Sequence, residues 1–489
     1  MDTPGSPPVV YPPPFHQKVI ALEAPGGEPA SVSLVAPTIV APGEPFLLKI
    51  AVLDAVGYPC VGFEGVVWVR APFAGHALIE VPFRAGQPAL AALQRLAIAE
   101  PGLHRFEATL DGEPFPGNPV CCIRKPAERI FWGDPHVHTV LSNCHPDRCR
   151  SLNFCYAAAR YLSGLDWATA ADHVSNGRCD FSKWKAQMAA ADAYDDPPHF
   201  ATLPGYEASL KGGCGGDTNP YFRRPPAMFI DEYEDGNVRT LCEKLEAEVG
   251  ADGFFVVPHH TTRTGKHGEI PDAIYPGPQR MPVIEIHSKW GTSEYRGNPN
   301  ALQEIHPGPS YAADLLARGL RLGFIAGTDS HATMPSGGGL ESGHINRPPG
   351  LTAAIAPQLS RDAVFDAIRT CRCYAASRER IYLDVTLDGV PMGQDVPCPD
   401  STKPRRIQVT AAAQSDIVSV DIVRNGETIH SHAPGGWQTG FLFDDEDDLA
   451  TRWLDSPHLG PFAYLYARVT CTSGAQAWSS PFWLLPAGL

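Results

Sequence analysis

The sequence predicts an α/β protein in which a barrel-like parallel sheet lies between two β-sandwich domains. Three changes of texture along the chain support this prediction. Short β-rich runs without helical stretches fill residues 31–122, strands alternate with helices over 129–376, and strands return after residue 380. The chain has 489 residues. At roughly 150 residues for each domain, a chain of this length is expected to form three domains.

The N-terminal domain, residues 1–125, is predicted to be an Ig-like β-sandwich. Its apolar runs are short and are broken by turn residues, as at 46–52 and 65–69. Regularly spaced strands of this kind are typical of antiparallel sandwiches. We expect no catalytic residue in this domain.

The central domain, residues 126–378, is predicted to alternate helices and strands. Apolar residues at helical spacing over 152–162 are followed by Gly164, where a helix is expected to end, and by a buried strand at 165–171. Two further helix-strand units are expected, at 237–249 with 254–257 and at 311–318 with 322–326. Such alternation predicts a largely parallel sheet, and polar residues at the carboxyl ends of its strands predict an active site on that face of a barrel.

The C-terminal domain, residues 379–489, is predicted to be a second β-sandwich. Strand-like runs occupy 381–387, 407–411 and 417–423. The last of these leads into Asn425 and Gly426, a dipeptide that strongly favours a hairpin turn. Antiparallel strands are therefore expected to close the chain.

Charge and cysteine content restrict the class of protein. Lys and Arg number 39 against 54 Asp and Glu, for a net charge of −15, so nucleic acid is not an expected partner. No apolar stretch of about 18 residues occurs, and the Pro-rich start lacks a leader pattern, so no membrane partner is expected. The 13 scattered cysteines fit free thiols in a reducing compartment. We expect a cytoplasmic protein with a small-molecule substrate; its oligomeric state has no signal in the sequence.

Apolar runs that end in imidazole and carboxylate side chains are the main functional signal. Buried strands can deliver such side chains to one point, and imidazoles with carboxylates bind borderline divalent cations. The candidate ligands in these runs are His136, His138, His173, Glu207, His259, His287, Asp329 and His331, whereas Asp172 is expected to orient an imidazole without binding metal. A single His-x-His pair would be a weak signal, but this ordered series predicts a shared metal centre.

The ordered series resembles the polymerase and histidinol phosphatase (PHP) domain of metal-dependent phosphoesterases. The segment 131–134 before the first histidine pair further resembles a subgroup of uncharacterised PHP-like proteins, and the similarity extends to 477–481 near the C-terminus. The resemblance implies a distorted (β/α)7 barrel of the PHP type, flanked here by the two sandwiches. It also implies two or three divalent metal ions, which would be zinc, manganese or iron.

The resemblance implies the ligands of each cation. The first cation would be held by His136, His138, Glu207 and Asp329. The second would be held by Glu207, His259 and His287. Glu207 suits the shared position because a carboxylate offers separate oxygen atoms to two cations.

The implied third cation is where the chain departs from the resemblance. His173 and His331 would be joined by the residue six positions after His138, where the family has His or Asp and this chain has Cys144. A thiolate binds zinc well and favours softer metals, so Cys144 is a candidate ligand, with His145 as the alternative. Without a thiolate ligand, this third site would be weak or empty.

These residues predict a metal-dependent hydrolase. Two cations roughly 3.5–4 Å apart lower the pKa of a shared water toward 7, so a metal-bridged hydroxide can attack the substrate without a protein nucleophile. Glu207 would be the bridging carboxylate, and His173 or His331 would protonate the leaving group if the third cation is absent. Arg263 and Lys289 follow ligand-bearing segments and are candidates to bind an anionic substrate.

Phosphoester hydrolysis of the PHP type is the first expectation for the reaction. The same hydroxide attacks carboxyl esters, carbamates and amides, so hydrolysis of these bonds stays open as an alternative. A non-catalytic metal-binding or ligand-binding protein is a second alternative. The complete series of ligand-type residues favours the enzyme.

Overall fold

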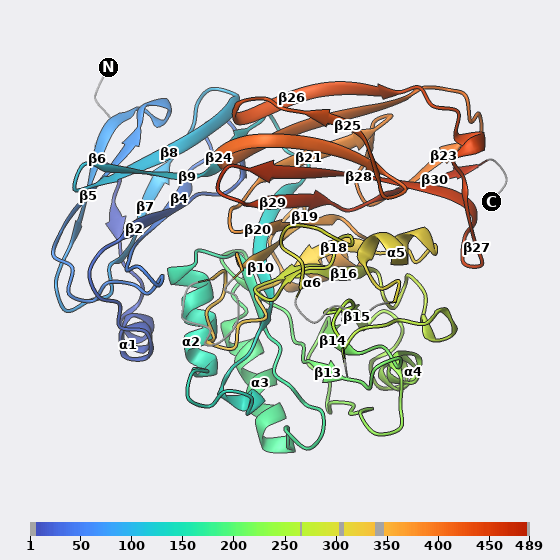
Figure 1. The fold of residues 1–489 in the computed structure, drawn as a ribbon. Coiled ribbons are helices and arrows are strands. Elements are labelled where there is room, and N and C mark those ends of the chain that lie inside the picture. The colour runs from blue at the N-terminus through green and yellow to red at the C-terminus, as the bar shows by residue number, and fades with distance from the viewer. Residues whose placement is uncertain (1–5, 265–266, 303–307, 338–346, 487–489) are drawn as a thin grey trace.

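The structure is a computed structural model that describes residues 6–264, 267–302, 308–337 and 347–486. Figure 1 shows the two N-terminal sheets on the left, the C-terminal strands along the top, and most helices of the middle region below them. Among the described residues, no helix is long and apolar enough to cross a membrane.

Residues 9–122 form two sheets that enclose one hydrophobic core. Leu48 of β4 and Val67 of β5 are fully buried in this core, although they belong to different sheets. The four-stranded sheet has the order β1-β7-β4-β2, and the five-stranded sheet has the order β3-β9-β8-β5-β6. The helix α1 (Pro14–Glu23) precedes β2. The strands are β1 (Val9–Val10), β2 (Ser31–Val35), β3 (Ile39–Val40), β4 (Phe46–Leu53), β5 (Gly65–Ala71), β6 (His76–Phe83), β7 (Leu90–Leu96), β8 (Gly102–Leu110) and β9 (Glu113–Cys122).

Local capping residues determine where the helices of the middle region begin. Asn237 caps α4 by accepting hydrogen bonds from the N–H groups of Arg239 and Thr240, and the Thr240 hydroxyl accepts one from Asn237. Asp180 and Ser360 cap α3 and α6. The helices are α2 (Leu152–Ala157), continued by a π-helical turn, α3 (Phe181–Tyr194), α4 (Val238–Val249), α5 (Ala312–Ala317) and α6 (Arg361–Arg369). The helices predicted at 237–249 and 311–318 correspond to α4 and α5.

The strands of the middle region are divided among three sheets. β10, β11 and β12 pair in parallel, whereas β10 pairs with β19, and β19 with β20, in the antiparallel sense. A second sheet, β13-β14-β15, is antiparallel, and a third, β17-β16-β18, contains one parallel pair. The strands are β10 (Arg129–Val137), β11 (Trp167–Ala170), β12 (Ala201–Thr202), β13 (Ala208–Ser209), β14 (Asp217–Phe222), β15 (Phe254–Pro258), β16 (Val283–Ser288), β17 (Gly291–Thr292), β18 (Gly323–Ala326), β19 (Gly350–Ala356) and β20 (Cys373–Ser377).

The C-terminal strands continue the sheet that contains β10. Pairing of Tyr374 in β20 with Ser479 in β29 joins the two regions, and the resulting sheet has 15 strands. Its longest strand, β24, has 20 residues and pairs with strands on both sides. The strands are β21 (Tyr382–Leu387), β22 (Val390–Pro391), β23 (Asp395–Cys398), β24 (Arg405–Arg424), β25 (Glu427–His432), β26 (Gly436–Asp445), β27 (Leu454–Ser456), β28 (Gly460–Cys471), β29 (Gln476–Ser479) and β30 (Phe482–Pro486).

The predicted fold class, a (β/α)7 barrel flanked by two sandwiches, is wrong. The structure is 42% strand and 16% helix, with several sheets and few helices. Within the described part of the middle region, the strands that pair in parallel are β10–β11, β11–β12 and β16–β18, and the other parallel contacts are isolated bridges. The C-terminal strands share a sheet with β10, so they do not form a separate flank. Sequence periodicity is a local signal that does not encode which strands pair, and the antiparallel hairpin of β13 and β14 interrupts the expected alternation.

Candidate metal centre

The end of β10 and the segment after β18 bring the first candidate ligands together. His136 lies in β10, and His138 follows directly after the strand. The Asp329 N–H donates to the His136 carbonyl at 2.8 Å, and the His138 N–H donates to the Ser330 carbonyl at 3.0 Å. Asp329 has a φ of 49°, a left-handed conformation that few non-glycine residues adopt. This docking aligns the Asp329 carboxylate with both imidazoles.

Backbone register also places Glu207 in the centre. A parallel β-bridge joins Glu207 to His173, and the Glu207 N–H donates to the Asp172 carbonyl at 3.0 Å. The Glu207 carboxylate is buried and faces four imidazoles. Its Oε2 lies 3.5 Å from His136 Nε2, 3.2 Å from His138 Nε2 and 3.1 Å from His173 Nδ1, and its Oε1 lies 3.5 Å from His259 Nε2. One carboxylate therefore faces imidazoles with each of its two oxygen atoms.

We call His136, His138, Glu207 and Asp329 the deep group, because all four side chains are buried and their ligand atoms lie close together. The Nε2 of His138 lies 3.2 Å from Glu207 Oε2 and 3.0 Å from Asp329 Oδ1, and the Nε2 of His136 lies 3.5 Å from each. A tetrahedral zinc ion with bonds of about 2.0–2.1 Å holds its ligand atoms about 3.3–3.4 Å apart. The spacing of the deep group fits a cation of this size.

Two ligand atoms of the deep group, His136 Nε2 and Glu207 Oε2, are buried and have no hydrogen-bond partner among the residues that the structure describes. Native structures rarely leave buried polar atoms in this state, and an ion is one of the standard explanations. The donor set of two imidazoles and two carboxylates suits zinc, manganese or ferrous iron. These residues therefore fit the kind of cation that the sequence predicts.

Charges within the deep group favour positive charge between its carboxylates. Burial disfavours the charged forms, but Asp329 and Glu285 raise the pKa of His136 well above its usual value. Burial is likewise outweighed at His138, where Asp329 and Glu207 raise the pKa to about 10. Despite burial, the surrounding imidazoles hold the pKa values of Glu207 and Asp329 well below their usual range. Two buried carboxylates thus remain ionised and attract cations.

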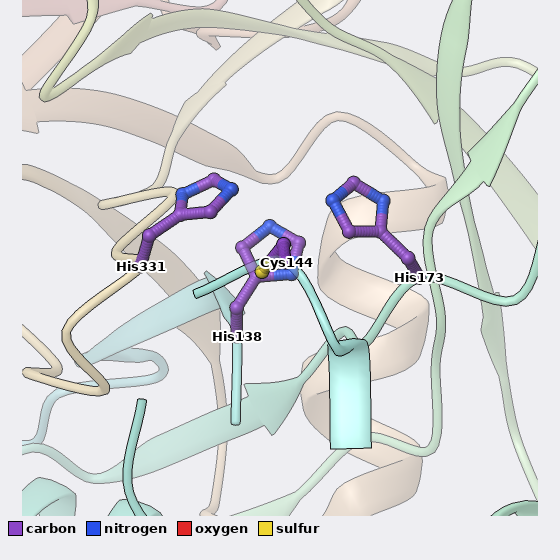
Figure 2. A group of neighbouring side chains, drawn as sticks. All are labelled: His138, Cys144, His173 and His331. Carbon is purple, nitrogen blue, oxygen red and sulfur yellow. The ribbon is translucent and has the colours of Figure 1, made fainter. Parts of the chain in front are cut away.

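A second group of ligand-type atoms shares His138 with the deep group. This outer group consists of His138, Cys144, His173 and His331, and Figure 2 shows their side chains gathered around one point. The His138 ring lies 4.5 Å from that of His173 and 4.2 Å from that of His331 between centroids. The side chains of His173 and His331 are 10% and 12% exposed, whereas that of His138 is 0% exposed. The outer group is therefore the side of the centre that borders solvent.

The thiol of Cys144 lies in an environment that favours its ionised form. A hydrogen bond from Cys149, followed by contacts with His173 and His331, holds the pKa of Cys144 well below its usual value despite partial burial. A thiolate, and not a thiol, is the metal ligand. His145 lies beside this group, with its ring 5.2 Å from that of His331.

A third group, Asp217, His259 and His260, lies at the start of β14 and the end of β15. The strands pair antiparallel through Thr218 and Pro258, and the His259 N–H donates to the Asp217 carbonyl at 3.1 Å. The structure thus brings His259 beside the Glu207 carboxylate, as the resemblance implied. The other ligand-type residues beside His259 are Asp217 and His260, and not His287. His259 was a predicted ligand, whereas Asp217 was not predicted.

The structure does not bring His287 into these groups. Both of its ring nitrogens are hydrogen-bonded, because Nε2 donates to the Pro348 carbonyl at 2.8 Å and Nδ1 accepts from the Thr292 hydroxyl at 2.7 Å. Burial lowers the pKa of His287 to about 4, which keeps this ring neutral. The pairing of β16 with β18 shifts register between Glu285 and His287, so the simple alternation of strand faces fails there. The implied role of His287 as a ligand has no support in this geometry.

Arg263 and Lys289, the two side chains predicted to bind an anionic substrate, lie in different surroundings near the candidate metal centre. The Arg263 guanidinium lies 5.2 Å from the centroid of the Trp290 ring, which is 5.5 Å from the His331 ring. The Trp290 indole N–H also donates to the Asp329 carbonyl at 3.3 Å. Lys289 is buried, and its backbone N–H donates to the Thr328 carbonyl at 3.1 Å. Trp290 thus contacts both Arg263 and His331 of the outer group.

Supporting residues around the ligands were only partly foreseen. The Glu285 carboxylate accepts a hydrogen bond from His136 Nδ1 at 3.1 Å. This role was not predicted, because a ligand role was assigned to His287, two residues later, and none to Glu285. Asp172 accepts hydrogen bonds from the Thr139 N–H at 2.6 Å and from the Ser142 hydroxyl at 2.6 Å. The Ser142 oxygen in turn accepts from His138 Nδ1 at 2.9 Å. Asp172 therefore orients a ligand-type imidazole through Ser142.

Comparisons with known proteins give relatives but no activity. No protein-family model matches the chain. Uncharacterized proteins of Chlamydia muridarum, Chlamydia trachomatis serovar D and Chlamydia pneumoniae are 34%, 27% and 26% identical over 413, 406 and 404 residues. Each match covers 80% of this chain, and the chain spans 63% of the length of these curated relatives.

Among solved structures, a Salmonella alpha-2-macroglobulin reacted with methylamine is matched with a TM-score of 0.16 and 9% identity, over 94% of this chain and 24% of that chain. A likeness this low carries no argument about fold or function.

Proposed function

We propose that this chain is a metal-dependent hydrolase whose cations are bound at the deep group and the outer group. The observation that carries the proposal is the deep group itself, where four buried side chains converge at the spacing of tetrahedral metal ligands. Burying two carboxylates costs several kcal/mol unless they are paired or coordinate a metal. Their placement among imidazoles is understandable if a cation is held there.

The shared histidine divides the ligands between the two groups. His138 Nδ1 is hydrogen-bonded to Ser142, so a single ring nitrogen, Nε2, is left to bind a cation. That atom lies 3.0 Å from Asp329 Oδ1 in the deep group. If His138 serves the deep group, the outer group keeps Cys144, His173 and His331. Three protein ligands with an open fourth position are characteristic of catalytic zinc sites, and this position lies on the solvent side.

The chain's own residues then have distinct roles. Glu207 presents Oε2 to His136 and His138 in the deep group and Oε1 to His259, so it can serve as a ligand shared between two cations. When bound, the cations would polarise the scissile bond and lower the pKa of a water toward about 7. If the outer group holds no cation, His173 or His331 is placed to give a proton to the leaving group. Arg263, held against Trp290, supplies positive charge for an anionic substrate.

Phosphoester hydrolysis is the proposed reaction. The order of the ligand-type residues resembles that of PHP phosphoesterases, and the Arg263 guanidinium beside the outer group suits a phosphate oxygen. Carboxyl esters, carbamates and amides remain the alternative substrates, since the same centre can attack them. A metal-binding protein without turnover is the alternative of a different class.

The proposal is tested by elemental analysis and by hydrolysis assays on the whole chain. Protein purified without added metal should contain about two or more equivalents of zinc, manganese or iron. A panel of chromogenic phosphomonoesters, phosphodiesters, carboxyl esters and carbamates, assayed before and after chelation, identifies the bond that is hydrolysed. Activity on phosphoesters that chelation abolishes would support the proposal.

Glu207→Gln is the decisive variant, with Glu234→Gln as its matched control. Glu207→Gln should lower both metal content and activity, because the amide nitrogen cannot act as a ligand. Glu234 is an exposed carboxylate paired with Lys211, so its replacement should change neither. Less than about one equivalent of metal in the wild-type protein would overturn the proposal. Bound metal without hydrolysis of any ester would instead favour the metal-binding alternative.

A further inference from the structure

We infer that Asp217, His259 and His260 form a separate binding site for a borderline divalent cation, beside the deep group. The ligand atoms of these three residues lie within 4.8 Å of one another, and the three residues are 2%, 2% and 6% exposed. The site takes the place of the second metal site implied by the sequence, in which His259 was to be joined by His287. The inference adds a cation site to the proposed hydrolase. It rests on the proposed function only in that a cation also binds at the deep group.

The hydrogen bonds of Asp217 leave one oxygen atom available. Its Oδ2 is hydrogen-bonded to Nδ1 of His267, whereas its Oδ1 is buried and has no hydrogen-bond partner within the described part of the chain. A buried carboxylate oxygen in this state is costly unless it binds a cation. The His267 ring thus orients Asp217 in the way that hydrogen bonds orient metal-binding carboxylates.

His259 and His260 also have ring nitrogens for which the described ranges of the chain provide no hydrogen-bond partner. The buried Nδ1 of His259 has none, and neither does Nδ1 of His260, which lies 3.8 Å from Asp217 Oδ2. The other nitrogen of His260 lies 3.2 Å from Asp329 Oδ2. An imidazole that faces a carboxylate with one nitrogen and a cation with the other is the usual arrangement of a metal-binding histidine.

Two carboxylates connect this site to the deep group. Asp329 presents Oδ1 to His138 in the deep group and Oδ2 to His260, and Glu207 presents Oε2 to His138 and Oε1 to His259. Both carboxylates thus contact the two groups through different oxygen atoms. A cation at each group would neutralise charge that Asp217, Glu207 and Asp329 bring together in a buried space.

The donor set identifies the class of cation. One carboxylate and two imidazoles suit zinc, manganese or ferrous iron, and they disfavour calcium and magnesium, which prefer oxygen ligands. Three protein ligands leave positions for Glu207, water or substrate. The site therefore has the chemistry of a further catalytic-type cation site.

The backbone at His260 supports the assignment and provides a suitable variant. His260 has a φ of 52°, and strain of this kind persists where the surrounding structure enforces it, often at functional sites. Asn adopts this left-handed conformation more readily than most residues. His260→Asn therefore removes the imidazole without opposing the local backbone. Asp217→Asn is the isosteric change at the carboxylate.

The test is a titration of the metal-free whole chain with Zn²⁺ alone. Isothermal titration calorimetry and elemental analysis measure how many equivalents of Zn²⁺ are bound. Asp217→Asn and His260→Asn should each bind about one equivalent fewer than the wild type, because each loses a ligand of the same site. Asp231→Asn is the control, since this exposed carboxylate accepts hydrogen bonds from the backbone of Asn176 and Tyr233 in a nearby loop. It should bind as many equivalents as the wild type.

Two results separate failure of this site from failure of the hydrolase. If both third-group variants fold, as judged by circular dichroism, and bind as many equivalents as the wild type, the inference is overturned, even if Glu207→Gln still loses metal. If wild-type protein binds no Zn²⁺, the inference and the proposed function both fail. Should Asp217→Asn not fold, His260→Asn alone decides between these results.

Discussion

The Nδ1 atom of His136 lies 3.1 Å from Oε2 of Glu285, although the two residues are 149 positions apart in the sequence. Because a carboxylate only accepts hydrogen bonds, His136 carries a proton on Nδ1, and Nε2 is the ring nitrogen that would bind a cation in the deep group. The contact crosses from β10 to β16, two strands of different sheets. It orients a ligand-type ring from outside the ligand set.

The first prediction concerns this contact. Glu285→Ala should lower the metal affinity of the deep group by about 10- to 100-fold, the usual effect of losing a partner that orients a metal-binding histidine. Glu285→Gln should have a smaller effect, because its amide oxygen can still accept the hydrogen bond. Competition of the protein with a chromogenic chelator measures both affinities. Equal affinities for Glu285→Ala and the wild type would show that Glu285 does not orient His136.

The second prediction concerns the hydrogen bonds that end at Asp172. Asp172→Ala should destabilise the metal-free protein by about 1–3 kcal/mol, because it leaves the buried Thr139 N–H and the Ser142 hydroxyl without their acceptor. Urea unfolding in the presence of a chelator measures this change. Asp180→Ala removes a helix cap at an exposed position and is the control, with an expected loss of about 1 kcal/mol. A smaller loss for Asp172→Ala than for this control would contradict the prediction.

The third prediction concerns the thiol of the outer group. Cys144→Ser should weaken zinc binding at that group, because a hydroxyl is a much poorer zinc ligand than a thiolate. Cys179→Ser is the control, since the Cys179 thiol donates to the Asp180 carbonyl and belongs to none of the three groups. Zinc content after dialysis against a weak chelator distinguishes the two variants. Equal zinc content in both would exclude Cys144 as a ligand.

The fourth prediction concerns pH and a residue far from the metal centre. Lys49 donates to the carbonyls of Gly164 and Leu165 at 3.1 and 3.3 Å, and burial lowers its pKa to about 8 from the usual 10.5. The unfolded chain therefore binds this proton more tightly than the folded protein. The resulting penalty is full below about pH 8 and disappears as the pH rises toward about 10.5, so Lys49 makes stability increase over that interval.

Lys49→Met removes this titration and should flatten the increase in stability between about pH 8 and 10.5. Urea unfolding of the wild type and of Lys49→Met at several pH values measures the free energy of unfolding of each protein. The titration of other groups cancels in the difference between the two proteins. An equal rise in both proteins would show that Lys49 titrates at its ordinary pKa in the folded state.

The sequence located the ligand-type residues better than it described the fold. His136, His138, Glu207 and Asp329 follow or end apolar runs, and the structure brings their side chains together in the deep group. Such runs can be recognised without knowing the topology, because a buried strand that ends in polar residues presents them at an edge. Whether a cation binds them is the subject of the experiments above.

Pairing of strands was the part that the sequence could not reveal. Alternation of helices and strands suggested a parallel barrel, but β19 pairs with β10 in the antiparallel sense and β14 pairs with β15 in a separate sheet. The choice of partner depends on long-range contacts that leave no periodic trace. The role of His287 rested on the family resemblance, and the register shift between Glu285 and His287 in β16 is a long-range feature that the sequence did not indicate. Asp217 was not predicted because it begins β14, whose sequence DTNPYF does not form an apolar run.

The joining of β20 to β29 has a consequence for any attempt to isolate the middle region. A fragment that ends at residue 378 would expose the backbone N–H and C=O groups of β20 that now pair with Ala477, Trp478 and Ser479. Bare edges of this kind recruit strands from other molecules, so such a truncation should aggregate instead of yielding an isolated folded domain. The two regions are expected to melt together, as one cooperative unit.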